Sequence, residues 1–142
     1  MENIERVLKN SKTIAMIGVS SLKKKEDPKN LKRKPSTIVM KYMQGYGFKV
    51  YPVNPSAKGE KILGEEVYAK ITDINKNIDI VDVFRPSKEV YEIAQDSIKI
   101  GAKVLWLQLG IKDENAQKLV EANKMKYIEN KCTKIEYQKY FL

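Results

Sequence analysis

The residues best suited to bind a phosphate group are Gly18, Ser20 and Ser21, which directly follow the apolar run from Thr13 to Ile17. An apolar run of this length that ends at a turn-forming residue is typical of a strand buried on both faces. Glycine has no side chain, so a ligand can approach the backbone closely there. The two serines add hydroxyl and amide groups, and the pattern therefore predicts an anion-binding turn after the first strand.

Catalytic chemistry is restricted because the chain has no histidine and only one cysteine, Cys132. This composition excludes phosphohistidine chemistry, Ser-His-Asp triads, His-rich metal sites and an internal disulfide. Any catalysis must use carboxylates, lysine, tyrosine or the single thiol. Asp79 and Asp82 alternate faces of one predicted strand, so we expect no catalytic carboxylate pair there and expect Asp82 to support the turn after that strand. No metal-ligand spacing occurs.

The formal net charge of +9 indicates an anionic partner: nucleic acid, a membrane surface or a phosphate-rich small molecule, unless it reflects a lysine-rich composition. Cations are densest in a polar stretch from Lys23 to Lys34, which we interpret as a loop. It contains no aromatic side chain to stack on bases, so only non-specific nucleic-acid attraction is expected from it. The charged start resembles no signal peptide, and no apolar run reaches membrane-spanning length, so we expect a cytoplasmic protein with no membrane partner.

Strand and helix patterns alternate along the whole chain. Strands are predicted at residues 13–17, 48–53, 62–68 (a short edge strand), 78–84, 103–109 and 126–129. A short lid helix is predicted at residues 2–9, and a second helix from Pro35-Ser36 to Gly45 or Gly47. A third helix is predicted from Arg85-Pro86-Ser87 to Gly101, and a fourth after Asp113. The last helix is predicted at residues 134–140, with Ile135 and Tyr140 facing inward. Trp106 is expected in the core.

This order predicts one α/β domain over residues 1–142, a Rossmann-like doubly wound fold with a mostly parallel sheet and helices on both faces. Such folds bind ligands beyond the carboxyl ends of their strands. Nicotinamide dinucleotides are disfavoured, because the three-glycine fingerprint is reduced to Gly18 and the second strand ends in Asn54 rather than a carboxylate. NADP stays conceivable because of the lysines. A phosphorylated adenine nucleotide of another kind fits better, with Ser36 at a helix amino end and Lys58 at the rim.

The chain resembles the small standalone CoA-binding proteins, which share the CoA-binding fold of the succinyl-CoA synthetase alpha subunit. The resemblance rests on five segments in the family's order: Thr13-Ile-Ala-Met-Ile-Gly-Val-Ser-Ser21, Gly47-Phe-Lys-Val-Tyr-Pro-Val-Asn-Pro55, Ile80-Val-Asp-Val-Phe-Arg-Pro86, Gly101-Ala-Lys-Val-Leu-Trp-Leu-Gln-Leu-Gly110 and Cys132-Thr-Lys-Ile-Glu136.

The resemblance implies a site for coenzyme A, free or acylated. It places pyrophosphate oxygens at Gly18, Ser20 and Ser21, with Lys58 as a phosphate contact although the family's spacing is one residue shorter. The adenosine would lie beside Val53, Asn54 and Pro55, a third wall would be Val83, Phe84, Arg85 and Pro86, and the pantetheine arm would emerge at Gln108 and Gly110.

The synthetase phosphorylates a histidine in a second domain and works with a partner subunit, and this chain has neither that domain nor a histidine. We therefore expect non-enzymatic binding of CoA or an acyl-CoA. The alternative is a component of a CoA-dependent acyl-transfer or thiol-redox enzyme, with a partner protein supplying catalytic residues. Cys132 lies between Lys131 and Lys134, which favour thiolate, so it is either a thiol for mixed-disulfide exchange with CoA or a small residue of the last turn. The oligomeric state stays open.

Overall fold

A five-stranded sheet forms the centre of the computed structural model, which describes residues 3–21 and 35–142. The sequence's Lys23–Lys34 loop lies outside the described residues. All strand pairs are parallel, in the order β2-β1-β5-β6-β7. The strands are β1 (Thr13–Ile17), β2 (Lys49–Val53), β5 (Ile80–Val83), β6 (Val104–Leu107) and β7 (Lys126–Ile128). The predicted α/β, Rossmann-like fold with a parallel sheet is confirmed.

The strand order reverses beside β1. The chain first passes from β1 to its neighbour β2, and then crosses β1 to build β5, β6 and β7 on the other side. Open α/β sheets bind ligands at such a reversal, because the two connections diverge and leave a crevice. Here the reversal lies between the ends of β1 and β5, the strands that lead into Gly18 and Phe84.

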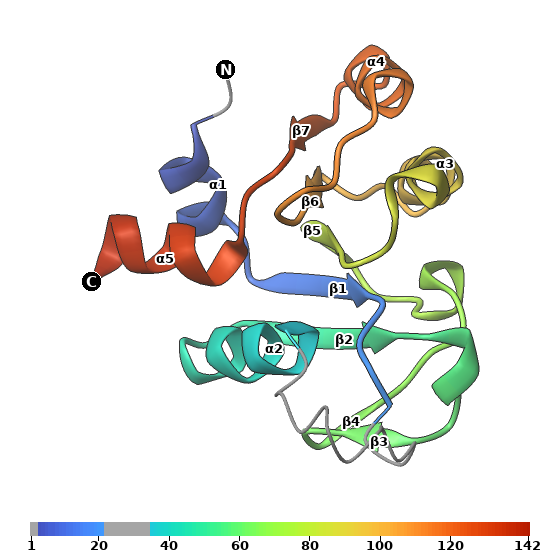
Figure 1. The fold of residues 1–142 in the computed structure, drawn as a ribbon, viewed down its shortest axis with the longest axis vertical. Helices are drawn as coiled ribbons and strands as arrows, with labels where there is room; N and C mark the ends of the chain where they lie inside the picture. The colour runs from blue at the N-terminus through green and yellow to red at the C-terminus, as the bar shows by residue number, and fades with distance from the viewer. Residues whose placement is uncertain (1–2, 22–34) are drawn as a thin grey trace.

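Helices cover both faces of the sheet (Figure 1). One face carries α1 (Ile4–Asn10), α2 (Pro35–Gly45) and α5 (Thr133–Phe141), and the other carries α3 (Val90–Lys99) and α4 (Glu114–Ala122). Alternate residues of each strand belong to the two cores, since successive side chains point to opposite faces. In β1, for example, Ile14 and Met16 pack under α2 while Ala15 and Ile17 face α3.

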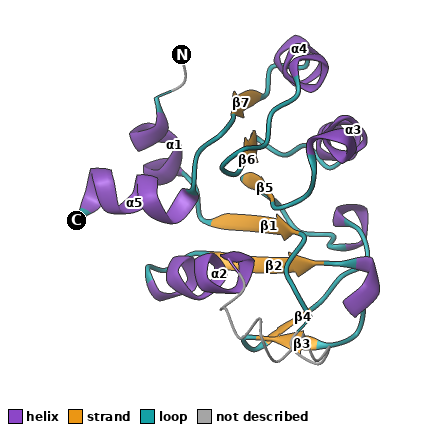
Figure 2. Cartoon of the chain, in the orientation of Figure 1, coloured by secondary structure: helices purple, strands orange, loops and turns teal. Residues whose placement is uncertain are grey.

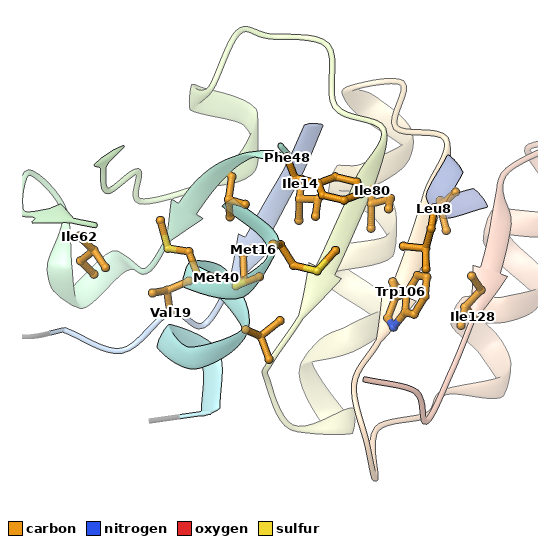
Figure 3. Packing of buried hydrophobic residues seen from close by; sticks show 14 of the residues in the cluster. Leu8, Ile14, Met16, Val19, Met40, Phe48, Ile62, Ile80, Trp106 and Ile128 are labelled. Carbon is orange, nitrogen blue, oxygen red and sulfur yellow. The ribbon is translucent and has the colours of Figure 1, made fainter. Parts of the chain in front are cut away.

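The core under α1, α2 and α5 is centred on Met16, Met40 and Trp106, all fully buried (Figure 3). Trp106 donates its indole N–H to the Lys131 carbonyl oxygen at 2.8 Å, so its polar atom is satisfied. The prediction that Trp106 is a core residue is confirmed.

The predicted edge strand at residues 62–68 is wrong in form. This segment is a separate antiparallel hairpin of β3 (Lys61–Ile62) and β4 (Glu65–Glu66), which lies beyond β2 at the edge far from β7 (Figure 2). Leu63 and Gly64 both have positive φ, 49° and 82°, which matches the two-residue turn that closes such hairpins. Tyr68 then forms only a single parallel bridge to Val53.

The inward face of the last helix also differs from the prediction. Ile135 and Tyr140 are 49% and 36% exposed, whereas Thr133 and Glu136 are buried and Tyr137 and Phe141 pack partly against the core. The rotation of α5 follows from its first residue, because the Thr133 hydroxyl donates to the buried carboxylate of Asp82.

A second small difference concerns α3, which is preceded by a 3-10 turn, η4 (Ser87–Glu89), so Arg85-Pro86-Ser87 does not cap it directly.

Candidate functional site

The turn after β1 is formed by close contact between two backbones. Gly18 has φ of +93°, its N–H donates to the Val53 carbonyl oxygen at 2.8 Å, and a Cβ there would lie 2.5 Å from the carbonyl oxygen of Phe84. Phe84 in turn donates its N–H to Ile17 at 2.8 Å. Only glycine fits this position, and the ends of β1, β2 and β5 therefore meet at one bare stretch of backbone.

Ser20 and Ser36 are brought together across the 15 intervening positions between them in the sequence. The Ser20 N–H donates to the Ser36 hydroxyl at 3.1 Å, and Ser36 is buried in the first turn of α2. The amino end of α2 therefore faces the turn that follows Gly18. Backbone N–H groups and the partial positive charge of a helix amino end favour an anion.

Ser21 has a partner that the sequence did not reveal. Its hydroxyl lies 2.9 Å from both carboxylate oxygens of Glu60 and donates to them, and the Ser21 side chain is buried. Glu60 follows the 3-10 turn η2 (Pro55–Ala57) and its backbone pairs with Val67. Lys58, at the end of η2, is exposed. A carboxylate therefore contacts the predicted phosphate turn, while the structure gives no contact between Lys58 and the described part of that turn.

A cavity of about 560 Å³ opens at the ends of β1 and β2, against α3 and the 3-10 turn η3 (Ile71–Asp73). Gly18, Val53, Asn54, Pro55 and Arg85 line it, so five of the predicted site residues share one cavity. Two hydrogen bonds hold the Asn54 side chain in place in the cavity lining. Its amide group donates to the Val19 carbonyl oxygen at 2.9 Å, and its side-chain oxygen accepts from the Ser56 N–H. The volume is in the range of small-molecule sites.

The far wall of this cavity carries both signs of charge. Arg85 donates two hydrogen bonds to Glu89, at 3.1 and 2.8 Å, and Glu92, Asp96, Lys70 and Lys99 complete the charged lining. The Arg85 side chain passes over Gly18, where its Cδ would lie 2.9 Å from an added Cβ. This wall suits a ligand portion with little net charge, such as a nucleoside, better than a phosphate cluster.

The remaining predicted residues lie around the same edge but not in the cavity. Val83 is fully buried, and Pro86 is exposed before η4. Gly110 has φ of +81° and its N–H donates to the Asn130 side chain at 2.7 Å. Gln108 is only 5% exposed and its side chain points inward, so only its backbone faces the edge of the sheet.

Gln108 belongs to a buried polar cluster around Asp82. Its amide donates to one carboxylate oxygen of Asp82 at 2.5 Å, and Thr133 donates to the other at 3.0 Å. Burial raises the pKa of Asp82 to about 7, although these two donors oppose the rise. The prediction that Asp82 supports the turn after β5 is wrong, because the carboxyl instead joins β5, β6 and the start of α5.

Asp79 lies at the opposite end of β5. It accepts from the N–H groups of Lys12 and Thr13 and pairs with Lys103. Burial alone would raise its pKa, but these hydrogen bonds outweigh burial and lower it. Asp79 and Asp82 therefore have separate structural roles. Among residues 3–21 and 35–142, no cluster of three Asp, Glu, Cys or His side chains could hold a metal ion.

Cys132 is half-buried at the position before the first residue of α5. Its carbonyl accepts from Glu136 N–H, and its side chain packs beside the core. It follows β7 and so lies at the carboxyl edge of the sheet. Glu60, Asn130 and the lining from η3 and α3 were missed, because each joins the site through long-range contacts rather than a local motif.

Comparison with known families identifies the fold. A family model described as "CoA binding domain" matches residues 12–138. The chain belongs to the CoA binding domain family. The predicted membership is confirmed, whereas the specific likeness to the succinyl-CoA synthetase alpha subunit stays a prediction.

Two proteins are similar to this chain over most of its length. The Bacillus subtilis protein "Uncharacterized protein YneT" is 31% identical over 134 residues, which are 94% of this chain and 91% of that protein. A solved "hypothetical protein from Pyrococcus horikoshii OT3" is 32% identical with a TM-score of 0.84, over 98% of this chain and 90% of that one.

A larger enzyme contains a similar region. The dinucleotide-forming acetyl-coenzyme A synthetase 1 of Ca. Korarchaeum cryptofilum, solved with phosphate and ADP, is 25% identical with a TM-score of 0.65. The match covers 88% of this chain but only 27% of the synthetase.

The helices were also compared with the length and apolarity that a membrane span needs, and none of those in residues 3–21 and 35–142 reaches both.

Proposed function

We propose that this CoA binding domain protein binds coenzyme A, free or acylated, across the carboxyl edge of its sheet, and that binding rather than a reaction is its own activity. The observation that carries the proposal is the cavity that begins at Gly18 and continues between Asn54 and Arg85. It lies where the strand order reverses, in a chain whose family model is described as CoA binding.

The residues present fit such a ligand in parts. The bare backbone of Gly18, the hydroxyls of Ser20 and Ser21 and the amino end of α2 with Ser36 would hold the pyrophosphate, with Lys58 beside it. Ser21 would exchange its hydrogen bond to Glu60 for one to a phosphate oxygen. The adenosine would lie in the cavity, whose charged side chains are of both signs. Val53, Asn54 and Pro55 would contact it on one side and Arg85 on the other. The coenzyme itself would supply a thiol or thioester at the end of its flexible arm.

The rest of the predicted set lines the way out of this site. Phe84 packs against the core and Pro86 is exposed beside Arg85, while Val83 contributes only backbone. We propose that the pantetheine arm leaves past the backbone of Gln108 and Gly110, since both follow β6 on the same edge.

Calorimetry with CoA, dephospho-CoA and NAD tests this function. We expect CoA to bind about tenfold to a hundredfold more tightly than dephospho-CoA, because charge-assisted hydrogen bonds to the 3′-phosphate from a cation of the adenosine cavity, such as Lys70, would contribute about 1.5–3 kcal/mol. NAD should bind weakly, since β2 ends in Asn54 rather than in a carboxylate. Absence of binding by both CoA and dephospho-CoA would refute the proposal.

A second candidate is a subunit of a CoA-dependent enzyme. The observation that favours it is the synthetase, in which the matching region is 27% of a longer chain. In this case turnover would appear only when a partner chain supplies catalytic residues. Purification of the native complex, followed by acyl-CoA formation or cleavage assays with and without the partner, distinguishes the two.

A further inference from the structure

A second cavity lies at the opposite end of the sheet from Gly18. It has a volume of about 540 Å³ and is bounded by α1, the α3–β6 connection and the α4–β7 connection. Its apolar floor consists of buried Val7, Ala102, Val104 and Met125, with half-buried Ile98 beside them. We call this cavity the basic pocket, for the cations described next.

The charged side chains that line the basic pocket are all cationic: Arg6, Lys103, Lys124 and Lys126. Lys103 pairs with Asp79 at 3.3 Å, while Arg6, Lys124 and Lys126 form no ion pair with any described residue. The cavity at Gly18 differs, since Glu89, Glu92 and Asp96 stand there among its cations. The three cations other than Lys103, around one concave and partly apolar surface, repel each other unless an anion enters.

Helix dipoles account for only one of these cations, Lys124, which follows the carboxyl end of α4. Lysine in the last turn of a helix stabilises it, and Lys9 and Lys99 already occupy that position in α1 and α3. Arg6 is instead in the first turn of α1, where a cation is unfavourable, and Lys126 begins β7. Lys124 has φ of +62°, a conformation that favours glycine over lysine.

We propose that the basic pocket binds a small organic anion with a hydrocarbon body. The phosphate or carboxylate head would lie between Arg6, Lys124 and Lys126, and the hydrocarbon would cover Val7, Ala102 and Met125. Arginine and lysine bind both head groups through charge-assisted hydrogen bonds. This site is separate from the CoA site at the other end of the strands and does not depend on it.

NMR titration of the ¹⁵N-labelled protein with octyl phosphate and with octanoate tests the location. We expect saturable shifts at the amides of Gly101, Ala102, Lys124 and Lys126, with those of Gly18 and Asn54 unchanged. The tighter of the two probes identifies the preferred head group. Saturation at Gly18 instead, equal binding by neutral octanol, or no saturable shift at all would overturn the proposal.

Variants that keep the fold stable test whether the cations of the basic pocket bind the probe. Lys124→Gly removes a cation and relieves its backbone strain, so the variant should be at least as stable as the parent protein. We expect its Kd for the better probe to rise about threefold, and that of Arg6→Gln/Lys124→Gly about tenfold. Lys118→Ala is the matched control, because Lys118 pairs with Glu114 on α4 outside the pocket. Equal affinities in all variants would contradict the proposal.

Discussion

A Cβ at Gly18 would lie 2.5 Å from the carbonyl oxygen of Phe84, closer than real Cβ atoms come to their neighbours. The glycine that is predicted to bind phosphate is therefore also the point where the ends of β1 and β5 are held together. The proposed binding and the fold therefore depend on the same missing side chain.

Gly18→Ala should be one of the most destabilising single changes in the protein. We expect a loss of about 2–5 kcal/mol, since positive φ and a backbone clash act together. Gly47→Ala is the matched control, because Gly47 has φ of +96° but no neighbour within 4 Å, and it should lose only about 1–2 kcal/mol. Urea unfolding measures both. Equal losses would show that the contact with Phe84 is not tight.

Glu60→Gln should change stability and ligand affinity in opposite directions. Ser21 donates to both oxygens of Glu60, so the amide weakens this interaction and we expect a loss of about 1 kcal/mol. The same change removes a negative charge beside the proposed pyrophosphate position, and the affinity for CoA should rise about threefold. Glu66→Gln, an exposed change on β4, is the control. Weaker CoA binding in Glu60→Gln would place the phosphates elsewhere.

Asp82 should make the protein less stable as pH rises toward neutral. Its pKa is about 7 in the folded protein against 3.8 when solvated, so the folded state holds this proton more tightly. The stabilisation is complete below about pH 4 and is lost as pH rises through about 7, with an upper limit of about 4 kcal/mol. Asp82→Asn should abolish this component in unfolding curves measured from pH 4 to 8.

The control for Asp82 has the opposite sign. The pKa of Asp79 is lowered, so its carboxylate stabilises the fold above its solvated pKa and this contribution is lost as pH falls through the lower folded value. Asp79→Asn should therefore reduce stability at neutral pH and leave the Asp82 component in place. A parent protein and Asp82→Asn variant with parallel pH curves would show that Asp82 stays ionised in the core.

Cys132 should form a mixed disulfide with CoA when the protein is treated with CoA disulfide. The thiolate attacks one sulfur, a Cys132–CoA bond forms, and one CoA thiol leaves. If the proposed site holds the coenzyme near α5, labelling should be faster than with glutathione disulfide, which lacks the nucleotide. Intact-mass analysis follows the adduct, with Cys132→Ser as control. No CoA adduct would assign Cys132 a purely structural role.

Strands were predictable here because a parallel sheet is buried on both faces, and its strands are therefore short apolar runs. The helix caps were predictable because a cap depends on residues that are close in the sequence. At the start of α4, for example, the Asp113 side chain accepts a hydrogen bond from the Ala116 N–H. The β3–β4 hairpin was missed because its turn uses Leu63 at a positive φ, where asparagine or glycine is the usual signal.

The site was only partly predictable because several of its contacts join distant segments. Glu60 reaches Ser21 across 39 positions, and Thr133 reaches Asp82 across 51. No pattern within one segment of the sequence predicts either hydrogen bond. The orientation of α5 shows the same limit, since the Thr133 hydroxyl bonds to Asp82 and Gln108, both distant in the sequence, and Ile135 is left exposed.

The two edges of the sheet have a consequence for association between molecules. At one edge, the β3–β4 hairpin contacts β2, Tyr68 bridges Val53, and Lys49 pairs with Glu65 at 2.6 Å. At the other, β7 has only three residues and is flanked by Lys124 and Asn130, both with positive φ. A foreign strand finds neither a long nor a flat edge to extend, so the native sheet should resist edge-to-edge polymerisation even at high protein concentration.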